Sequence, residues 1–455
     1  MSHALLQAWE KNLHRRGGDR AIVQAGDGGA VTFGELDARA SSWLAMHGPG
    51  PASLKGRAVV FAAPNGIRWL EMFLGLLKAG AIVVPLDAAE PLPAQRRLAV
   101  ALRATAWWNG AELEPIAGAG RFRDPAACLV KLTSGSTGRP RALVFTAGQL
   151  LADGKQVTAT MGITSRDLNY ALIPLGHSYG LGNLTVPLLA QGVPLVCGSA
   201  PLPHAIAADF ERWRPTVFPG VPAIWRALAA SELTLPGLRL GISAGAALSP
   251  EVARDFAARF DRRLHNFYGS SETGGITYDT TGAATLRGGV GRALRGVKLA
   301  AQRGDRLEVA GAAVLTHGNR RRRGKLGAWL MADRVTLDAR GGATLLGRRG
   351  GIVKIAGRRV DLAEVTARLR RLAGVSEAWV GVSAGPEPVL GAVVESGRSA
   401  ADLRAALVTD TASWKIPKRL LAMAALPVTA RGKADAVALQ AMVFAGGASQ
   451  GQNQL

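Results

Sequence analysis

A loop of small and hydroxyl-bearing residues lies between Leu132 and Arg141, with the sequence LTSGSTGRPR. The residues that could contact a ligand through hydroxyl or backbone N–H groups are Thr133, Ser134, Gly135, Ser136, Thr137 and Gly138. Such groups can surround phosphate oxygens, and Arg139 and Arg141 add positive charge. The spacing does not match the G-x-x-x-x-G-K motif of P-loop NTPases. The loop alone leaves two interpretations open, a phosphate site of another kind or an ordinary surface turn.

The loop resembles the signature phosphate loop of the adenylate-forming superfamily, which includes acyl- and aryl-CoA synthetases, luciferases and the adenylation domains of peptide synthetases. In that family the loop reads Ser/Thr-Ser-Gly-Ser/Thr-Thr-Gly-X-Pro-Lys-Gly. This sequence departs from it where Arg141 replaces the lysine and Ala142 replaces the last glycine. Arg141 keeps the positive charge, but it presents a planar guanidinium group instead of an ammonium group.

Segments that resemble the family's other motifs follow in the family's order: Val31–Leu36, Gly75–Pro85, Pro174–Gly180, Gly245–Ala247, Tyr268–Glu272, Asp333, Gly347–Glu364 and Pro427–Lys433. Because the agreement extends along nearly the whole chain, the sequence is identified as a member of this superfamily. The resemblance implies ATP-dependent activation of a carboxylic acid. The acid displaces pyrophosphate, becomes an acyl-adenylate and then passes its acyl group to a thiol. ATP and Mg²⁺ are the implied cofactors.

The resemblance assigns catalytic roles on the phosphate side of this reaction. The 134–141 loop would hold the β- and γ-phosphates, Ser271 would hold an α-phosphate oxygen, and Glu272 would bind Mg²⁺. Lys433 would stabilise the charge on the α-phosphate and carboxylate oxygens in the transition state. His177 would border the acyl pocket.

The nucleoside would be held by a second set of residues, again by resemblance. Gly245, Ala246 and Ala247 would lie against adenine, and Tyr268 would stack on it. Gly269 is also assigned to ATP or AMP binding. Asp333 and Arg348 would hold the ribose hydroxyl groups. Met331 and Ala332 stand where the family has Thr-Gly before this aspartate, so one hydroxyl group is lost.

The thiol-transfer step is implied by the segment 354–360, which matches the family's loop at Lys354, Gly357 and Arg359. In the family, the small C-terminal domain rotates about a hinge and brings this loop to the active site. The thiol would belong to coenzyme A or to the phosphopantetheine arm of an acyl carrier protein. The net charge of +22 fits an acidic carrier protein, the phosphates of coenzyme A, or simply an arginine-rich composition.

The expected substrate is an acid without an α-amine. Relatives that activate amino acids place an aspartate near the segment Pro174–Gly180, and this segment (PLGHSYG) contains no carboxylate. Since an unpaired buried ammonium group is costly, fatty and aryl acids are favoured. The alternatives are a stand-alone adenylating enzyme that makes an amide or ester, and an inactive nucleotide-binding relative. No nucleic-acid-binding motif is found, so nucleic acid is not an expected partner.

Strand-like and helix-like stretches alternate over the first 270 residues or so. Apolar runs at Ala58–Ala63 and Ala81–Pro85 predict buried strands, and helical spacing of apolar residues lies between them. The same alternation returns from Thr216 to Tyr268, with helices predicted over Ala223–Ala230 and Pro250–Phe260. The pattern predicts an α/β fold with mainly parallel sheets flanked by helices.

Two domains and a hinge are expected from the change of composition along the chain. The large adenylation domain is predicted over 1–346, the hinge over 347–351 and a small mobile α+β lid domain over 352–445. Gly350 and Gly351 mark the hinge, because consecutive glycines give the backbone the most freedom. The residues 446–455 are polar and predicted to be disordered.

Cysteine content and apolar run lengths favour a cytoplasmic enzyme. The chain has 2 cysteines, Cys128 and Cys197, which excludes a disulfide framework and a cysteine metal cluster. No apolar run reaches the roughly 18–20 residues of a membrane-spanning helix. The first twenty or so residues lack the apolar core of a secretory signal.

Overall fold

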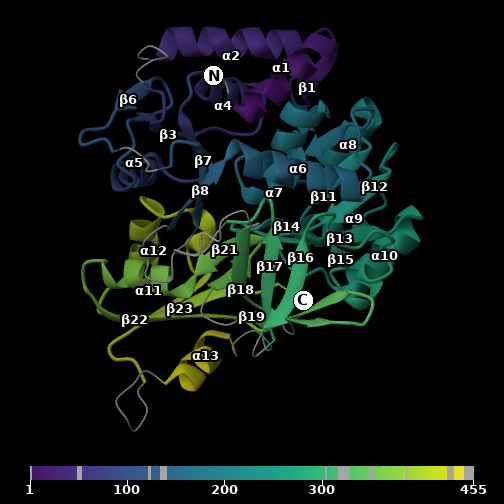
Figure 1. Cartoon of the computed structure of the whole chain (residues 1–455). Helices are drawn as coiled ribbons and strands as arrows, with labels where there is room; N and C mark the ends of the chain where they lie inside the picture. Colours follow the sequence, from purple (N-terminus) through teal and green to yellow (C-terminus); the bar gives the residue numbers. More distant parts are fainter. Residues whose placement is uncertain are drawn as a thin grey trace. The chain divides into compact units, whose positions relative to one another are not determined.

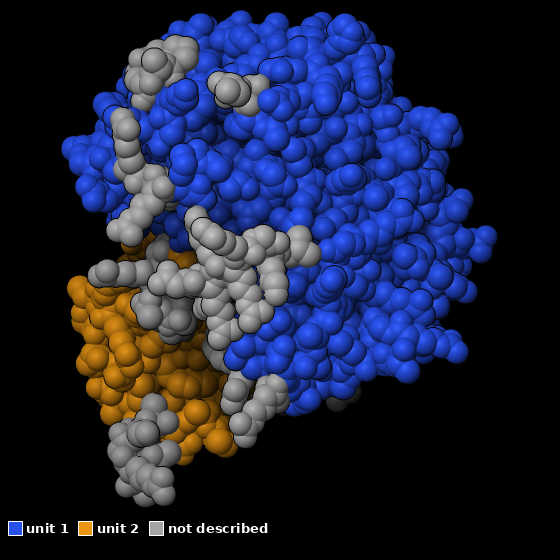
Figure 2. Space-filling view, in the orientation of Figure 1, with its two compact units in different colours: residues 1–88, 95–132, 142–349 blue, residues 89–94, 133–141, 350–455 orange. Residues whose placement is uncertain are grey.

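Each of two structural units is assembled from three stretches of the chain. In the computed structural model, which describes residues 3–48, 54–120, 124–133, 141–302, 305–315, 327–348, 352–385, 387–427 and 435–444, unit 1 contains Met1–Ala88, Gln95–Leu132 and Ala142–Arg349. Unit 2 contains Ala89–Ala94, Thr133–Arg141 and Gly350–Leu455. Figure 2 shows unit 1 in blue and unit 2 in orange. The expected domain bounds and hinge stay predictions, and Gly350 and Gly351 lie outside the described residues.

The largest sheet of unit 1 has nine strands in the order β15-β14-β13-β12-β11-β9-β10-β1-β2, and Figure 1 labels β11 to β15 among them. Its strands are β1 (Arg20–Gln24), β2 (Ala30–Thr32), β9 (Asn169–Ala171), β10 (Leu195–Cys197), β11 (Val217–Gly220), β12 (Leu240–Ser243), β13 (Leu264–Ser270), β14 (Gly274–Tyr278) and β15 (Arg292–Ala293). The strands from β1 to β13 across its middle are parallel, whereas β2, β14 and β15 are antiparallel to their neighbours. The antiparallel edge strands were not predicted from the sequence.

A six-stranded sheet with the order β6-β5-β3-β4-β7-β8 accompanies it. Its strands are β3 (Ala58–Ala62), β4 (Ile82–Leu86), β5 (Ala106–Trp108), β6 (Leu113–Pro115), β7 (Ala127–Thr133) and β8 (Arg141–Thr146). The strands β5, β3, β4 and β7 pair in parallel. Both apolar runs predicted as strands, at 58–63 and 81–85, are therefore found as β3 and β4, neighbours joined by a helix.

Helices cover these sheets: α1 (Ala4–Arg16), α2 (Phe33–His47), α4 (Ile67–Lys78), α5 (Leu92–Ala101), α6 (Ala147–Met161), α8 (Pro203–Trp213), α9 (Pro222–Ala229) and α10 (Pro250–Phe260). A short turn, α7 (Ser178–Gly180), continues into π-helical turns at Leu181–Thr185 and Pro187–Gln191. α1, α2 and α4 pack together (Figure 1). The large core between helices and sheets includes Trp9, Trp43 and Trp69. Among the described residues, no helix is long and apolar enough to cross a membrane.

A third, antiparallel sheet completes unit 1. It has the order β16 (Lys298–Gln302), β17 (Arg306–Gly311), β18 (Gly327–Leu337) and β19 (Ala343–Arg348). Its inner residues, such as Leu307, Val309 and Met331, share one core with Tyr268 and Ile276 of the nine-stranded sheet. This packing places β18 beside the end of β13.

Unit 2 has a mixed α+β architecture. A hairpin of β20 (Ile352–Ile355) and β21 (Arg358–Asp361) precedes α11 (Leu362–Arg370), and a three-stranded sheet follows with β22 (Val375–Val382), β23 (Leu390–Ser396) and β24 (Arg419–Met423). The helices α12 (Ala400–Val408) and α13 (Ala436–Phe444) complete it. The predicted α/β fold with mainly parallel sheets and a smaller α+β part is confirmed.

Candidate active site

The segment Pro174–Gly180 lies at the carboxyl edge of the nine-stranded sheet. The Tyr179 hydroxyl is 3.2 Å from the carbonyl oxygen of Ile242 at the end of β12, and 3.4 Å from that of Gly220 at the end of β11. The Tyr179 ring lies 5.8 Å from the Phe267 ring of β13. Burial raises the pKa of Tyr179 well above its ordinary value, so this residue remains a neutral hydrogen-bond donor. Open α/β sheets bind ligands at this edge.

The turn Gly245–Ala247 and the motif Tyr268–Glu272 reach the same edge on neighbouring strands. β12 and β13 pair in parallel, with Ser243 opposite Asn266, so the turn after β12 lies next to Tyr268. Tyr268 is buried and pairs with Thr277 of β14. The sequence-predicted adenine residues are thus brought close together along two adjacent strands, and their role stays a prediction.

Glu272 is held in a fixed position by its own backbone. Its N–H donates to the Ser270 hydroxyl at 3.2 Å, and its carbonyl oxygen accepts from the Leu315 N–H at 3.0 Å. The residue is 7% exposed. Its carboxylate suits Mg²⁺, which is commonly held by one or two carboxylates together with substrate phosphates. Among the described residues, no group of three or more histidine, cysteine, aspartate or glutamate side chains is placed to hold a metal ion.

Two further buried charges accompany Glu272, and sequence reasoning missed both. Lys131 of β7 and Asp153 of α6 are each almost fully buried, and the Asp153 carboxylate accepts from the Gly275 N–H at 2.9 Å. Burial lowers the pKa of Lys131, and the negative charges of Asp153 and Glu272 oppose this shift. Burial likewise raises the pKa of Asp153, opposed by Lys131 and by the Gly275 N–H. The Lys131 ammonium also lies 4.2 Å from the centre of the Phe145 ring.

The two residues predicted to hold the ribose lie on paired strands of the third sheet. Asp333 of β18 pairs with Arg348 of β19. The nearby Met331, which stands where the family has threonine, is buried, and its sulfur accepts from the Ser270 hydroxyl at 3.8 Å. The lost hydroxyl is therefore replaced by a thioether sulfur that accepts a hydrogen bond from the motif that carries Glu272.

His177 lies beside a carboxylate that its own segment does not contain. Its Nε2 is 3.1 Å from Oδ2 of Asp87, which directly follows β4. The expectation that Pro174–Gly180 has no carboxylate holds for the segment itself, but folding supplies one from a distant part of the sequence. Nothing local to residue 87 signals this contact.

The residues predicted to act in the thiol-transfer step lie in a hairpin of unit 2. Lys354 pairs with Arg359 across β20 and β21, and Ala356 and Gly357 form the two-residue turn between them. Both turn residues have positive φ, at 47° and 80°, as a type I′ hairpin turn requires. The positions of Lys354, Gly357 and Arg359 at one hairpin end are consistent with a common role, which stays a prediction.

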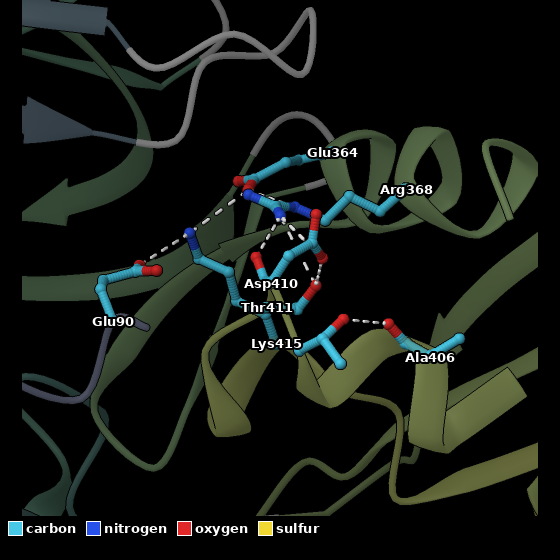
Figure 3. A network of polar contacts seen from close by, with 8 residues as sticks. Glu90, Glu364, Arg368, Ala406, Asp410, Thr411 and Lys415 are labelled. Carbon is cyan, nitrogen blue, oxygen red and sulfur yellow. Dashed lines mark hydrogen bonds and ion pairs between the residues drawn. The ribbon is translucent and has the colours of Figure 1, made fainter. Parts of the chain in front are cut away.

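A network of ion pairs and hydrogen bonds connects α11, which follows this hairpin, to the segment before β24 (Figure 3). The Lys415 ammonium is 3.2 Å from the Glu364 carboxylate and 3.5 Å from that of Glu90. Arg368 also binds Glu364, at 3.0 Å, and donates to the Asp410 carbonyl oxygen at 3.1 Å. α11 is thereby attached to the chain before β24.

The rest of the predicted site lies at or beyond the limits of the described residues. Thr133 ends β7, and Arg141 begins β8 with an exposed side chain. Ser134, Gly135, Ser136, Thr137 and Gly138 lie outside the described residues, as do Lys433, Gly350 and Gly351. Their roles therefore remain those implied by the resemblance.

Comparison with known proteins defines the class of this fold and site. The chain matches the family described as "AMP-binding enzyme" over residues 9–108 and 111–310. It is 28% identical to a feruloyl-CoA synthase from an Amycolatopsis species, over 94% of this chain and 97% of that protein. It is 27% identical to the benzoate–CoA ligase of Thauera aromatica, over 67% of this chain and 64% of that protein.

Solved structures show the same fold. The o-succinylbenzoate CoA synthetase of Bacillus subtilis superposes with a TM-score of 0.80 at 19% identity, covering 96% of this chain and 98% of that one. The chain belongs to the AMP-binding enzyme family. It is an AMP-forming acid–thiol ligase, because the relatives and the sequence motifs both indicate this enzyme class.

Proposed function

We propose that this enzyme joins an aryl carboxylic acid to coenzyme A through an acyl-adenylate. The observation that carries this proposal is the sheet edge at which Tyr179, the turn after β12 and the Tyr268–Glu272 motif meet. An acid oxygen attacks the α-phosphorus of ATP, the bond to the β-phosphate breaks, and pyrophosphate leaves. The coenzyme A thiol then attacks the acyl carbon, a thioester forms, and AMP leaves with the former acid oxygen.

Position and charge, more than covalent chemistry, are what this reaction needs from the protein. Glu272 would hold Mg²⁺, which neutralises phosphate charge when it is bound. Tyr268 and the turn at 245–247 would hold adenine, and Asp333 would hold the ribose. Lys433 would bind the oxygens on which negative charge increases during adenylation.

Aryl acids are favoured over fatty acids by the relatives' substrates. Feruloyl-CoA synthase and benzoate–CoA ligase, by their names, act on aromatic acids. Coenzyme A is favoured as the acceptor because both of these relatives are named for it. A carrier protein is the second candidate acceptor, since a net charge of +22 would attract an acidic partner.

A panel of acids in an ATP–pyrophosphate exchange assay tests the substrate class. We expect exchange above background with benzoic or cinnamic acids, weaker exchange with medium-chain fatty acids, and none with α-amino acids. The matching carboxamides, which lack the attacking oxygen, serve as blanks. Pyrophosphate exchange with amino acids and with no other acid would contradict the substrate proposal. If a thioester formed on a phosphopantetheinylated carrier protein but not on coenzyme A, the carrier protein would be the acceptor.

A further inference from the structure

A buried carboxylate contacts the histidine of the predicted acyl pocket. The Asp87 side chain is 8% exposed, whereas that of His177 is 39% exposed. The carboxylate thus lies on the protein side of the imidazole ring, and part of the ring remains accessible. Nε2 and Oδ2 are 3.1 Å apart, which is an ion-pair contact, and the ring N–H does not point straight at the oxygen as it would in a hydrogen bond.

The turn that carries His177 is held in place by several further contacts. The Asn65 side chain donates to the Ile173 carbonyl oxygen at 2.8 Å and accepts from the Leu175 N–H at 2.9 Å. Gly176 packs so closely on the end of β4 that an added Cβ would lie 2.8 Å from Cβ of Pro85. The His177 carbonyl oxygen accepts from the Leu181 N–H at 2.7 Å. With the backbone fixed, rotation of the imidazole ring is the freedom that remains.

We propose that Asp87 is a positioning residue that acts through His177. A small rotation of the ring from its present 3.1 Å contact lets the carboxylate accept a hydrogen bond from Nε2–H, which fixes the ring and leaves Nδ1 as the nitrogen through which His177 contacts the reacting acyl group. A carboxylate that accepts from one ring nitrogen sets the tautomer of a histidine in this way. This inference rests on the proposed function, because Asp87 can affect turnover only if the enzyme forms the proposed thioester.

The same carboxylate could otherwise bind the ammonium group of an amino acid substrate. These two uses of Asp87 compete, because the oxygen that would meet the ammonium group already lies 3.1 Å from Nε2 of His177. The structure favours the histidine contact, since the tight packing of Gly176 on Pro85 brings the two residues together. An ammonium-binding role is therefore an outcome that the test must distinguish.

Replacement of Asp87 by asparagine tests the positioning role. An asparagine amide can donate to Nε2 and favours the opposite tautomer, so Asp87→Asn should lower kcat for thioester formation by roughly 10–100-fold, as loss of such a supporting partner typically does. The KM for ATP should change less than about twofold. In a His177→Gln background the same substitution should change kcat less than about twofold, because coupled residues are not additive.

Asp209→Asn is a matched control. Asp209 is also buried, but its carboxylate binds Tyr170 at 2.7 Å and Ser199 at 2.9 Å instead of a histidine. Its replacement should lower the melting temperature, and any effect on kcat should be the same with and without His177. The proposal would be overturned if Asp87→Asn lowered kcat equally with His177 present and in the His177→Gln background. It would also be overturned if the only effect of Asp87→Asn were a higher KM for an amino acid substrate.

A spectroscopic measurement tests the pair independently of activity. With ¹⁵N-labelled histidine, assigned by comparison with His177→Gln, the wild-type ring at alkaline pH should show a protonated Nε2 and an unprotonated Nδ1. Asp87→Asn should shift the population toward protonated Nδ1. Unchanged nitrogen shifts in that variant would refute the positioning role, even if no acid supported exchange and the proposed function itself failed.

Discussion

Replacement of Lys433 by alanine should slow acyl-adenylate formation by about 10²–10³-fold, as loss of one preorganised charged group typically does. The expectation rests on the resemblance of the segment 427–433 to the family's C-terminal motif. The charge is needed only while negative charge increases on the phosphate and carboxylate oxygens. Thioester formation from a supplied acyl-adenylate should therefore remain within a few-fold of the wild-type rate.

Both half-reactions are measured separately by rapid quench on the same folded variant. Lys418→Ala is a suitable control, because Lys418 is an exposed lysine of the same unit. It should leave both rates nearly unchanged. An equal loss in both steps for Lys433→Ala would show that the residue does not act in adenylation alone.

Removal of Asp153 should destabilise unit 1 by about 3–5 kcal/mol, the usual cost of breaking a buried ion pair from one side. The Asp153→Ala variant would lose the acceptor of the Gly275 N–H and one of the two negative charges that face Lys131. Because Lys131 also faces Glu272, the region beneath the predicted magnesium ligand would be disturbed. Urea unfolding with unchanged slope m is the measurement.

Two further variants separate charge from packing in this cluster. Asp153→Ala combined with Lys131→Met should recover part of the lost stability, because the buried ammonium is removed together with its partner. Asp255→Ala, at an exposed position of α10, should change stability by no more than about 0.5 kcal/mol. A loss below about 1 kcal/mol for Asp153→Ala, or no recovery in the double variant, would contradict the charge argument.

Elements with strong local signals were predicted well from the sequence. The predicted helix over Pro250–Phe260 is α10 itself, since Ser249 caps its first turn and Pro250 occupies the first helical position. The predicted helix over Ala223–Ala230 is found as α9, Pro222–Ala229. These signals are short-range and can be detected in a single sequence.

The features that sequence reasoning missed depend on contacts between distant segments. Asp87 contacts His177 only because β4 and the turn at 173–177 pack together. An aspartate after a strand is common in loops, so residue 87 alone does not indicate this contact. Lys131 gave one usable signal, a single charge within the otherwise apolar strand at 127–133. The π-helical turns after Ser178 lie in an apolar run whose periodicity could not distinguish helix from strand.

The fate of the acid's oxygen atoms tests the central claim most directly. The enzyme is incubated with ATP, coenzyme A and an aryl acid that carries oxygen-18 in its carboxylate, and the AMP is examined by mass spectrometry. Since adenylation makes an acid oxygen bridge to the α-phosphorus, and thiol attack releases it with AMP, we expect AMP with a single heavy oxygen and a thioester that retains the other. Unlabelled AMP, or ADP with labelled phosphate, would contradict the acyl-adenylate mechanism.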